Sequence, residues 1–202
     1  MFIDFTGFAG DCLINGKLDL RAPRLTDQLN ADPLVHLVDV ELEDLENARR
    51  VSAPEFTIQR SQLCAVRATG PRGSRALRVA TAAHRLRAQI GPYTILGRLH
   101  EPPGIDPLTT FTQRDLMVPL TDATIAFMVG GVLDVRDWPT LVINRELASW
   151  YRAVDPDDDA LMATPEAEPA RVAVPGPKVL TLESGDRPRR HSGTAPRGSK
   201  SR

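Results

Sequence analysis

The sequence has few of the residues that mark a metal centre, a disulfide framework or an active site. Its 202 residues include only 2 cysteines and 4 histidines. Cys12 and Cys64 fit no metal-ligand spacing and are too few for a disulfide framework, so we expect two reduced structural thiols. No histidine stands at a zinc-type spacing from another ligand, and no glycine-rich loop ends in Lys-Ser/Thr. We therefore expect no enzymatic activity, no metal and no cofactor.

Two further absences concern charge and hydrophobic runs. The net charge is −1, so no overall field draws the protein to nucleic acid or to an anionic membrane. No apolar stretch reaches the roughly 18–20 residues of a membrane helix. The opening residues 1–5 lack the basic region and long apolar run of a signal peptide. We expect a soluble, cytoplasmic protein without membrane contacts.

What the sequence does contain is an internal repeat, in which three short segments recur in the same order. The offset between the copies grows only from 81 to 85 residues along the chain, as small loop insertions would produce. The matched segments are 13–18 with 94–99, 37–42 with 120–125, and 56–60 with 141–145. They align Gly16 with Gly97, Asp39 with Asp122, and Ile58 with Ile143.

Each copy predicts five short strands. Segments 12–20 and 93–100 alternate polar and apolar residues, as half-buried strands do, and segments 34–42 and 116–127 are the most apolar. Five short strands favour a small bent barrel, because closure removes exposed edges. Gly16 and Gly97 would permit the mid-strand bend. The second copy is expected to open with a strand at 77–81, a helix is expected near 25–30, and 145–153 could be strand or helix.

The predicted fold is therefore mainly β: two tandem five-stranded barrels of the SH3/Sm-like type with short helices, followed by a tail. The first barrel spans residues 1–70 and the second 71–154. Residues 155–202 are rich in proline and charge and show no strand or helix period. Such a composition cannot bury enough apolar area to offset its ordering entropy, so we expect a disordered tail.

Two motifs of the first copy resemble the signatures of Sm-like proteins. D-Q-L-N at 27–30, followed by L-V-D-V-E at 37–41, is similar to the first signature, and 58–66 approximates the apolar spacing of the second. The unit also resembles a bacterial family without an assigned function, in which it occurs singly or paired. The resemblance implies bent barrels that join edge to edge. It also implies a base-binding cradle, for which Asn30 (displaced) and Arg60 (offset by one) are the candidates here.

Residues 66–98 carry seven arginines and no acidic residue. The segment is either a solubilising edge that keeps strands from pairing or an anion-binding connector between the copies. Our leading hypothesis is a non-enzymatic module for protein docking or self-association. The alternative is binding of RNA or DNA through the basic 67–98 connector and the basic tail. The candidate nucleic-acid residues are Arg72, Arg75, Arg85, Arg87, Asn30 and Arg60.

Overall fold

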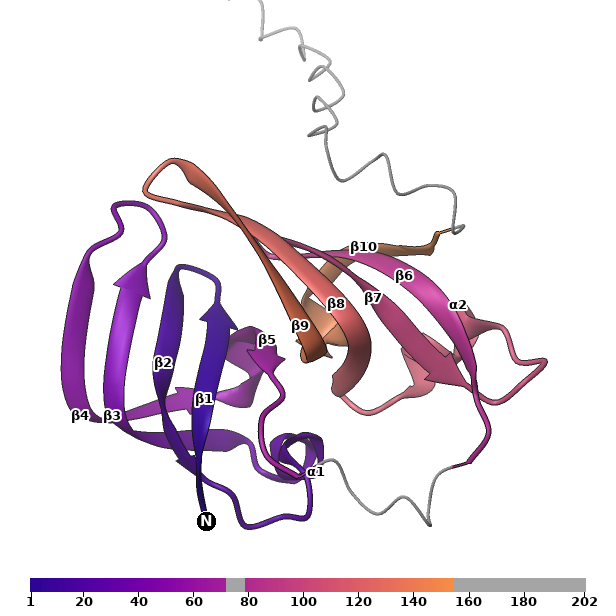
Figure 1. Cartoon of the computed structure of the whole chain (residues 1–202), viewed down its shortest axis with the longest axis horizontal. Helices are drawn as coiled ribbons and strands as arrows, with labels where there is room; N and C mark the ends of the chain where they lie inside the picture. Colours follow the sequence, from indigo (N-terminus) through magenta and orange to yellow (C-terminus); the bar gives the residue numbers. More distant parts are fainter. Residues whose placement is uncertain (72–78, 155–202) are drawn as a thin grey trace, which may run out of the picture. The chain divides into compact units, whose positions relative to one another are not determined.

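The computed structural model describes residues 1–71 and 79–154, and all of these belong to one compact unit, Met1–Ala163 (Figure 1). The expectations for Arg72, Arg75 and the tail 155–202 lie outside the described residues. The first half of the unit contains β1 (Phe2–Ala9), β2 (Cys12–Asp19), α1 (Leu25–Ala31), β3 (Leu34–Asp44), β4 (Arg50–Gln59) and β5 (Leu63–Arg67). The second half contains β6 (Ala82–Ile90), β7 (Tyr93–Glu101), α2 (Pro107–Gln113), β8 (Met117–Val129), β9 (Val132–Asn144) and β10 (Ala148–Ala153).

The ten strands form one open sheet in the order β10-β6-β7-β8-β9-β5-β1-β2-β3-β4. Every neighbouring pair is antiparallel. The mainly β class is therefore confirmed. The expected pair of five-stranded barrels is not confirmed. The strands form one continuous open sheet, because β9 of the second half pairs with β5 of the first.

The two halves share a pairing irregularity in their second strands. The β2·β3 register shifts between Asn15 and Lys17, and the β7·β8 register shifts between Leu96 and Arg98. The residue skipped in each case is a glycine. A Cβ on Gly97 would lie 2.8 Å from the Leu120 Cβ, and one on Gly16 would lie 3.1 Å from the Val38 carbonyl oxygen. Both glycines therefore allow the neighbouring strand to approach where the ladder bends.

Two hydrophobic clusters lie on opposite faces of the central strands. In β1, Phe5 belongs to one cluster and Phe8 to the other. In β5, Leu63 and Val66 belong to the first, while Cys64 and Ala65 belong to the second. The apolar run L-C-A-V is thus buried on both faces, as expected of a strand in the middle of a sheet rather than at its edge.

Three local expectations were wrong or incomplete. The strand expected at 77–81 is β6, at Ala82–Ile90, so Arg85 and Arg87 lie in the sheet and not in a connector. Region 145–153 begins with a 3-10 turn and continues as strand β10. Helix α2 was not predicted, although its signals are present. Asp106 caps it by accepting the Thr109 amide at 2.8 Å, and Pro107 occupies its first position.

Helix α1 is linked to the second half by a reciprocal pair of hydrogen bonds. The Asn30 amide nitrogen donates to the carbonyl oxygen of Met117 at 3.0 Å, and the Met117 amide donates to the Asn30 side-chain oxygen at 2.9 Å. Met117 is 1% exposed, so water cannot readily replace the side-chain amide. Asn30 therefore ties the helix of one half to the first residue of β8.

We predict that Asn30→Ala lowers the free energy of unfolding by about 1–3 kcal/mol, because it leaves both backbone groups of Met117 without partners. Urea denaturation of the full chain measures this change. The control is Asp32→Ala, an exposed residue just after the same helix. Equal midpoints for the two variants would contradict a linking role for Asn30.

Candidate functional site: two unpaired sheet edges

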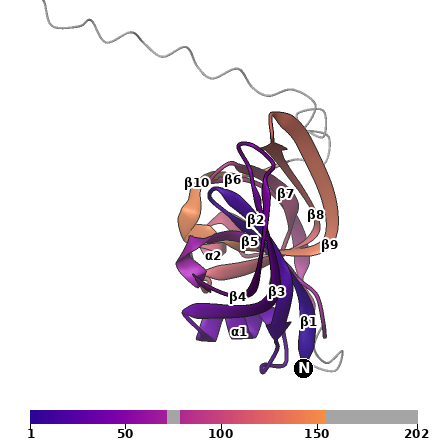
Figure 2. The same cartoon turned by 90° about the vertical axis from the view of Figure 1, so that its left-hand side faces the viewer.

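The sheet ends in two strands, β4 and β10, each paired on one side only. Figure 2 views the molecule from the β4 side. An edge strand presents a row of backbone N–H and C=O groups that can pair with another strand. These two edges are the most prominent unsatisfied feature of the described sheet, and the internal β5·β9 junction shows how such edges can join.

At the internal junction, Ala65 pairs with Ile143, Val66 with Val142 and Arg67 with Leu141. The Ala68 amide extends the ladder by donating to the Thr140 carbonyl oxygen at 3.1 Å. All these apolar strand residues are fully buried. The junction is thus a dry, in-register strand pairing, the arrangement that gives an edge its greatest stability.

Strand β10 pairs with β6 in the same way as β5 pairs with β1. In β5, Ala65 faces Phe8 and Leu63 faces Ala9, with one residue skipped between them. In β10, Trp150 faces Gln89 and Ala148 faces Ile90, again with one residue skipped. Trp150 therefore occupies the position of Ala65, and β10 is the counterpart of β5. By the same comparison, β4 on β3 is the counterpart of β9 on β8, since Ile58 faces Val35 as Ile143 faces Val118.

Apolar side chains are exposed at both edges. Trp150 on β10 is 42% exposed, whereas its counterpart Ala65 is fully buried. Leu34 at the start of β3 is 44% exposed, whereas its counterpart Met117 is 1% exposed. The apolar side chains exposed near the free edges therefore stand at positions whose counterparts are buried around the internal junction.

The two residues expected to cradle a base are engaged within the protein. Arg60 donates from Nη1 to the carbonyl oxygens of Leu29 and Asn30, at 2.8 and 2.5 Å. In the second half, Arg145 donates from Nε to the Arg114 carbonyl oxygen at 2.7 Å. Both arginines hold the carbonyls at the end of a helix, where a cation is stabilised. Asn30 is hydrogen-bonded to Met117, so both cradle candidates have hydrogen-bond partners within the fold.

Asp39 and Asp122 share an unusual backbone conformation. Their φ angles are +52° and +47°, in the left-handed region that non-glycine residues seldom adopt. Asp39 accepts from Lys17 Nζ at 3.0 Å, and Asp122 lies 3.4 Å from Arg98 Nη1. The hydrogen bond with Asp39 raises the pKa of Lys17. The shared motif is thus a strained turn of backbone at the bend of the sheet, flanked by an exposed ion pair.

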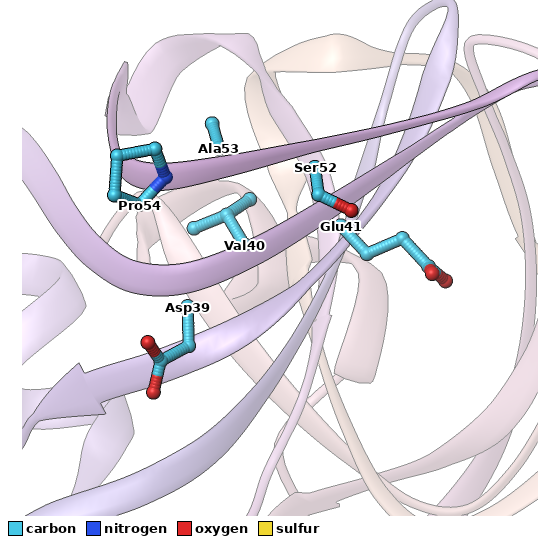
Figure 3. Close-up of a pocket in the computed structure, with 6 residues that line it drawn as sticks. All are labelled: Asp39, Val40, Glu41, Ser52, Ala53 and Pro54. Carbon is cyan, nitrogen blue, oxygen red and sulfur yellow. The ribbon is translucent and has the colours of Figure 1, made fainter.

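Asp39 also borders an open hollow of about 370 Å³ (Figure 3). Its two carboxylates, Asp39 and Glu41, point apart, so they do not form a pair for acid–base work. Glu41 lies 3.6 Å from Arg50. The hollow offers no reactive constellation beyond one serine hydroxyl. Its lining is Asp39, Val40, Glu41, Ser52, Ala53 and Pro54.

The surroundings of Cys12 and Cys64 make both thiols poor nucleophiles. Burial raises the pKa of Cys64 to about 11, and burial together with Asp11 raises the pKa of Cys12 to about 11. A thiol with such a pKa is protonated near neutral pH and is a poor nucleophile. Neither cysteine forms a disulfide.

Within 1–71 and 79–154, no group of three or more His, Cys, Asp or Glu side chains is placed to hold a metal ion. No helix in this part of the chain has the length and hydrophobicity to cross a membrane.

In comparisons with known proteins, no family model, no curated protein and no solved structure matches the chain.

We predict that Asp39→Gly is tolerated better than Asp39→Ala, by about 1–2 kcal/mol in the free energy of unfolding. Glycine adopts positive φ freely, whereas alanine has a Cβ that clashes in this region. The lost ion pair is exposed and common to both variants, so it contributes little to the difference. Urea denaturation distinguishes them, and Asp122→Gly with Asp122→Ala repeats the comparison in the second half. Equal stabilities within both pairs would show that backbone strain is unimportant here.

Proposed function

We propose that the protein is a non-enzymatic assembly module that joins further copies of itself through β4 and β10. The observation that carries the proposal is the β5·β9 junction, in which counterparts of these two edges already pair within one chain. The module would consist of two duplicated, Sm-like, bent β units.

Several local features support a duplication. Both halves have the same strand order, a helix between the second and third strands, and a 3-10 turn before the last strand. Asp39 and Asp122 share a positive φ at aligned positions. Arg60 and Arg145 perform the same helix-end task. Independent sequences would not converge on so many coincident details of register and backbone conformation.

The internal junction dictates the register of the external one. With β10 in place of β5 and β4 of a second copy in place of β9, the Ala153 amide would donate to the Glu55 carbonyl oxygen, as Ala68 does to Thr140. The side-chain pairs would be Trp150 with Ile58, Tyr151 with Thr57, and Arg152 with Phe56.

The external junction would be weaker than the internal one. Phe8 and Leu13 are fully buried in the hydrophobic cluster of the second half. At the corresponding positions of β6 and β7 stand the polar residues Gln89 and Thr94. Thr94 donates to Gln89 at 2.8 Å, so these side chains satisfy each other without a partner. Trp150 supplies the large aromatic contact typical of interface anchors. We therefore expect reversible association that depends on protein concentration.

The test uses proline to block one edge at a time in the full chain. The Val154 amide donates to Arg85 on β6, and strand residues alternate, so the Ala153 amide faces away from β6. Ala153→Pro removes this free donor, and Thr57→Pro removes the equivalent donor on β4. Proline at such edge positions leaves the existing ladder intact.

Mass measurement by light scattering over a concentration series should show assembly of the wild type but a single-chain mass for either variant. An equimolar mixture should form a heterodimer and nothing larger, because each variant retains one intact and complementary edge. Ala153→Ser, which keeps the amide, should assemble like the wild type. Assembly by Ala153→Pro alone, or a wild type of single-chain mass throughout, would contradict the proposal.

A further inference from the structure

The hairpin formed by β8 and β9 carries a stripe of exposed apolar side chains. Met128, Leu133 and Val135 are 49%, 62% and 53% exposed. Met128 pairs in register with Leu133, so both side chains lie on the same face of the hairpin. Val135 lies two residues after Leu133 and shares that face, whereas Phe127 lies on the opposite face, buried in the cluster of the second half. We call Met128, Leu133 and Val135 the hairpin stripe.

The hairpin stripe is connected to the β10 edge by a row of residues that crosses the second half. The row follows the strand register from β10 through β6, β7 and β8 to β9, and residues paired in register share a face of the sheet. Its members, in that order, are Trp150, Gln89, Thr94, Ala126 and Val135. The stripe is therefore continuous with the edge to which we assign an assembly role.

The first half contains the equivalent row, and there the second half covers it. Its members, in the same order, are Ala65, Phe8, Leu13, Glu43 and Arg50. The first three are fully buried in the cluster of the second half, and Glu43 is 9% exposed. Every member of the second-half row is half-buried or exposed. The same row is thus a contact surface in one half and an uncovered surface in the other.

Leu45 indicates what the end of such a row contacts. It lies in the turn after β3 and packs against the second-half cluster, which includes Ile125. Its carbonyl oxygen accepts from the Gly130 amide at 2.9 Å, and the ends of the two hairpins lie side by side (Figure 1). At the repeat offset, the counterpart of Leu45 is Met128. The counterpart of Ile125 is Leu42, so Met128 of one copy would reach the region of Leu42 in the next.

Leu42 belongs to an apolar surface of the first half that is partly open. It pairs in register with Val51 of β4, which is 51% exposed. Phe56, farther along β4, is half-buried. Leu42 and Phe56 both pack against the cluster of the first half, which places this surface on its core face. Apolar side chains are therefore available on both of the surfaces that the external junction would bring together.

We infer that the hairpin stripe of one copy packs on Leu42 and Val51 of the next copy, an inference that rests on the proposed function. Face contacts then hold the assembly together as well as strand pairing. Strand β10 has only six residues, and a pairing of that length falls short of the roughly 800 Å² per partner that a stable interface covers. The stripe supplies further area, and its apolar character suits the core of an interface.

The first test removes the apolar surface of the stripe in the full chain. The stripe variant carries Met128→Gln, Leu133→Gln and Val135→Thr, changes at exposed positions that cost the fold little. The control variant carries Val79→Thr and Val132→Thr. These two valines are 77% and 70% exposed, but Val79 precedes β6 and Val132 faces the opposite side of the hairpin from Leu133.

Light scattering over a concentration series should show self-association at least about tenfold weaker for the stripe variant, because it no longer buries apolar side chains on association. The control variant should associate like the wild type. Circular dichroism checks that each variant keeps the fold.

The second test adds one thiol to each surface in the heterodimer of the two proline variants. There the Thr57→Pro chain supplies β10 and the Ala153→Pro chain supplies β4. A short bismaleimide should join Met128→Cys in the Thr57→Pro chain to Val51→Cys in the Ala153→Pro chain. The reverse placement should not be joined, because the two thiols then lie on surfaces that do not meet. Heterodimers without the added thiols give the background from the two native cysteines.

The outcomes separate this inference from the proposed function. A folded stripe variant that assembles with the concentration dependence of the wild type would overturn the inference and leave the edge pairing intact. Equal cross-linking in the two placements would also overturn it, and this measurement decides the matter if the stripe variant does not fold. A wild type of single-chain mass throughout would overturn the proposed function, and this inference with it.

Discussion

The pairing of β5 with β9 is the interaction on which the rest of the structure depends. It makes one sheet from two halves, and each hydrophobic cluster includes residues from both. Met117 and Val142 complete the cluster of the first half, while Phe8 and Leu13 complete that of the second. Separation of the halves would expose these side chains at roughly 25 cal/mol per Å² of apolar area. The two halves are therefore expected to unfold together.

The same pairing explains why the two ends of the sheet matter. The junction pairs β5 with β9 inside the chain. Their counterparts β10 and β4 stand at the two ends of the sheet, where each has a neighbour on one side only. The side chains differ between these contexts: Trp150 at the outer edge stands where the junction has Ala65, and Gln89 stands where it has Phe8. The polar Gln89 lowers the cost of leaving its position exposed, whereas Trp150 leaves an apolar side chain available at the edge. The outer edges therefore suit reversible association, and the inner one suits permanent attachment.

The charged residues near the bend of the sheet also agree in part and differ in part between the two halves. The ion pair of Lys17 with Asp39 recurs as Arg98 with Asp122, at the strained residue where each half bends. Around that shared motif the first half carries Asp4 and the second half Arg85. The residue in register with the basic residue of the ion pair is thus acidic in the first half and basic in the second, although the chain as a whole has a net charge of −1. The net charge of the chain therefore does not describe the charge at this position, because interactions between exposed charges more than ~10 Å apart are largely screened.

The sequence by itself determined the β class and most of the strands, and it predicted an alignment of Gly16 with Gly97 and of Asp39 with Asp122. These features depend on local periodicity and on residues with special backbone freedom, both of which are visible in a single chain segment. Local pattern was a weaker guide where arginines alternate with apolar residues within a strand. The sequence therefore predicted a basic connector where the structure has strand β6.

Only the tertiary structure decided which strands pair across the halves and what the polar residues do there. Nothing in the local pattern of β9 specifies β5 as its partner, because backbone hydrogen bonding is the same for every strand. The partner is selected by which apolar faces are buried together. For the same reason Asn30 and Arg60, which resemble base-binding residues in sequence, serve Met117 and the end of α1 in the fold. An amide or guanidinium binds whichever carbonyl the packing brings within reach.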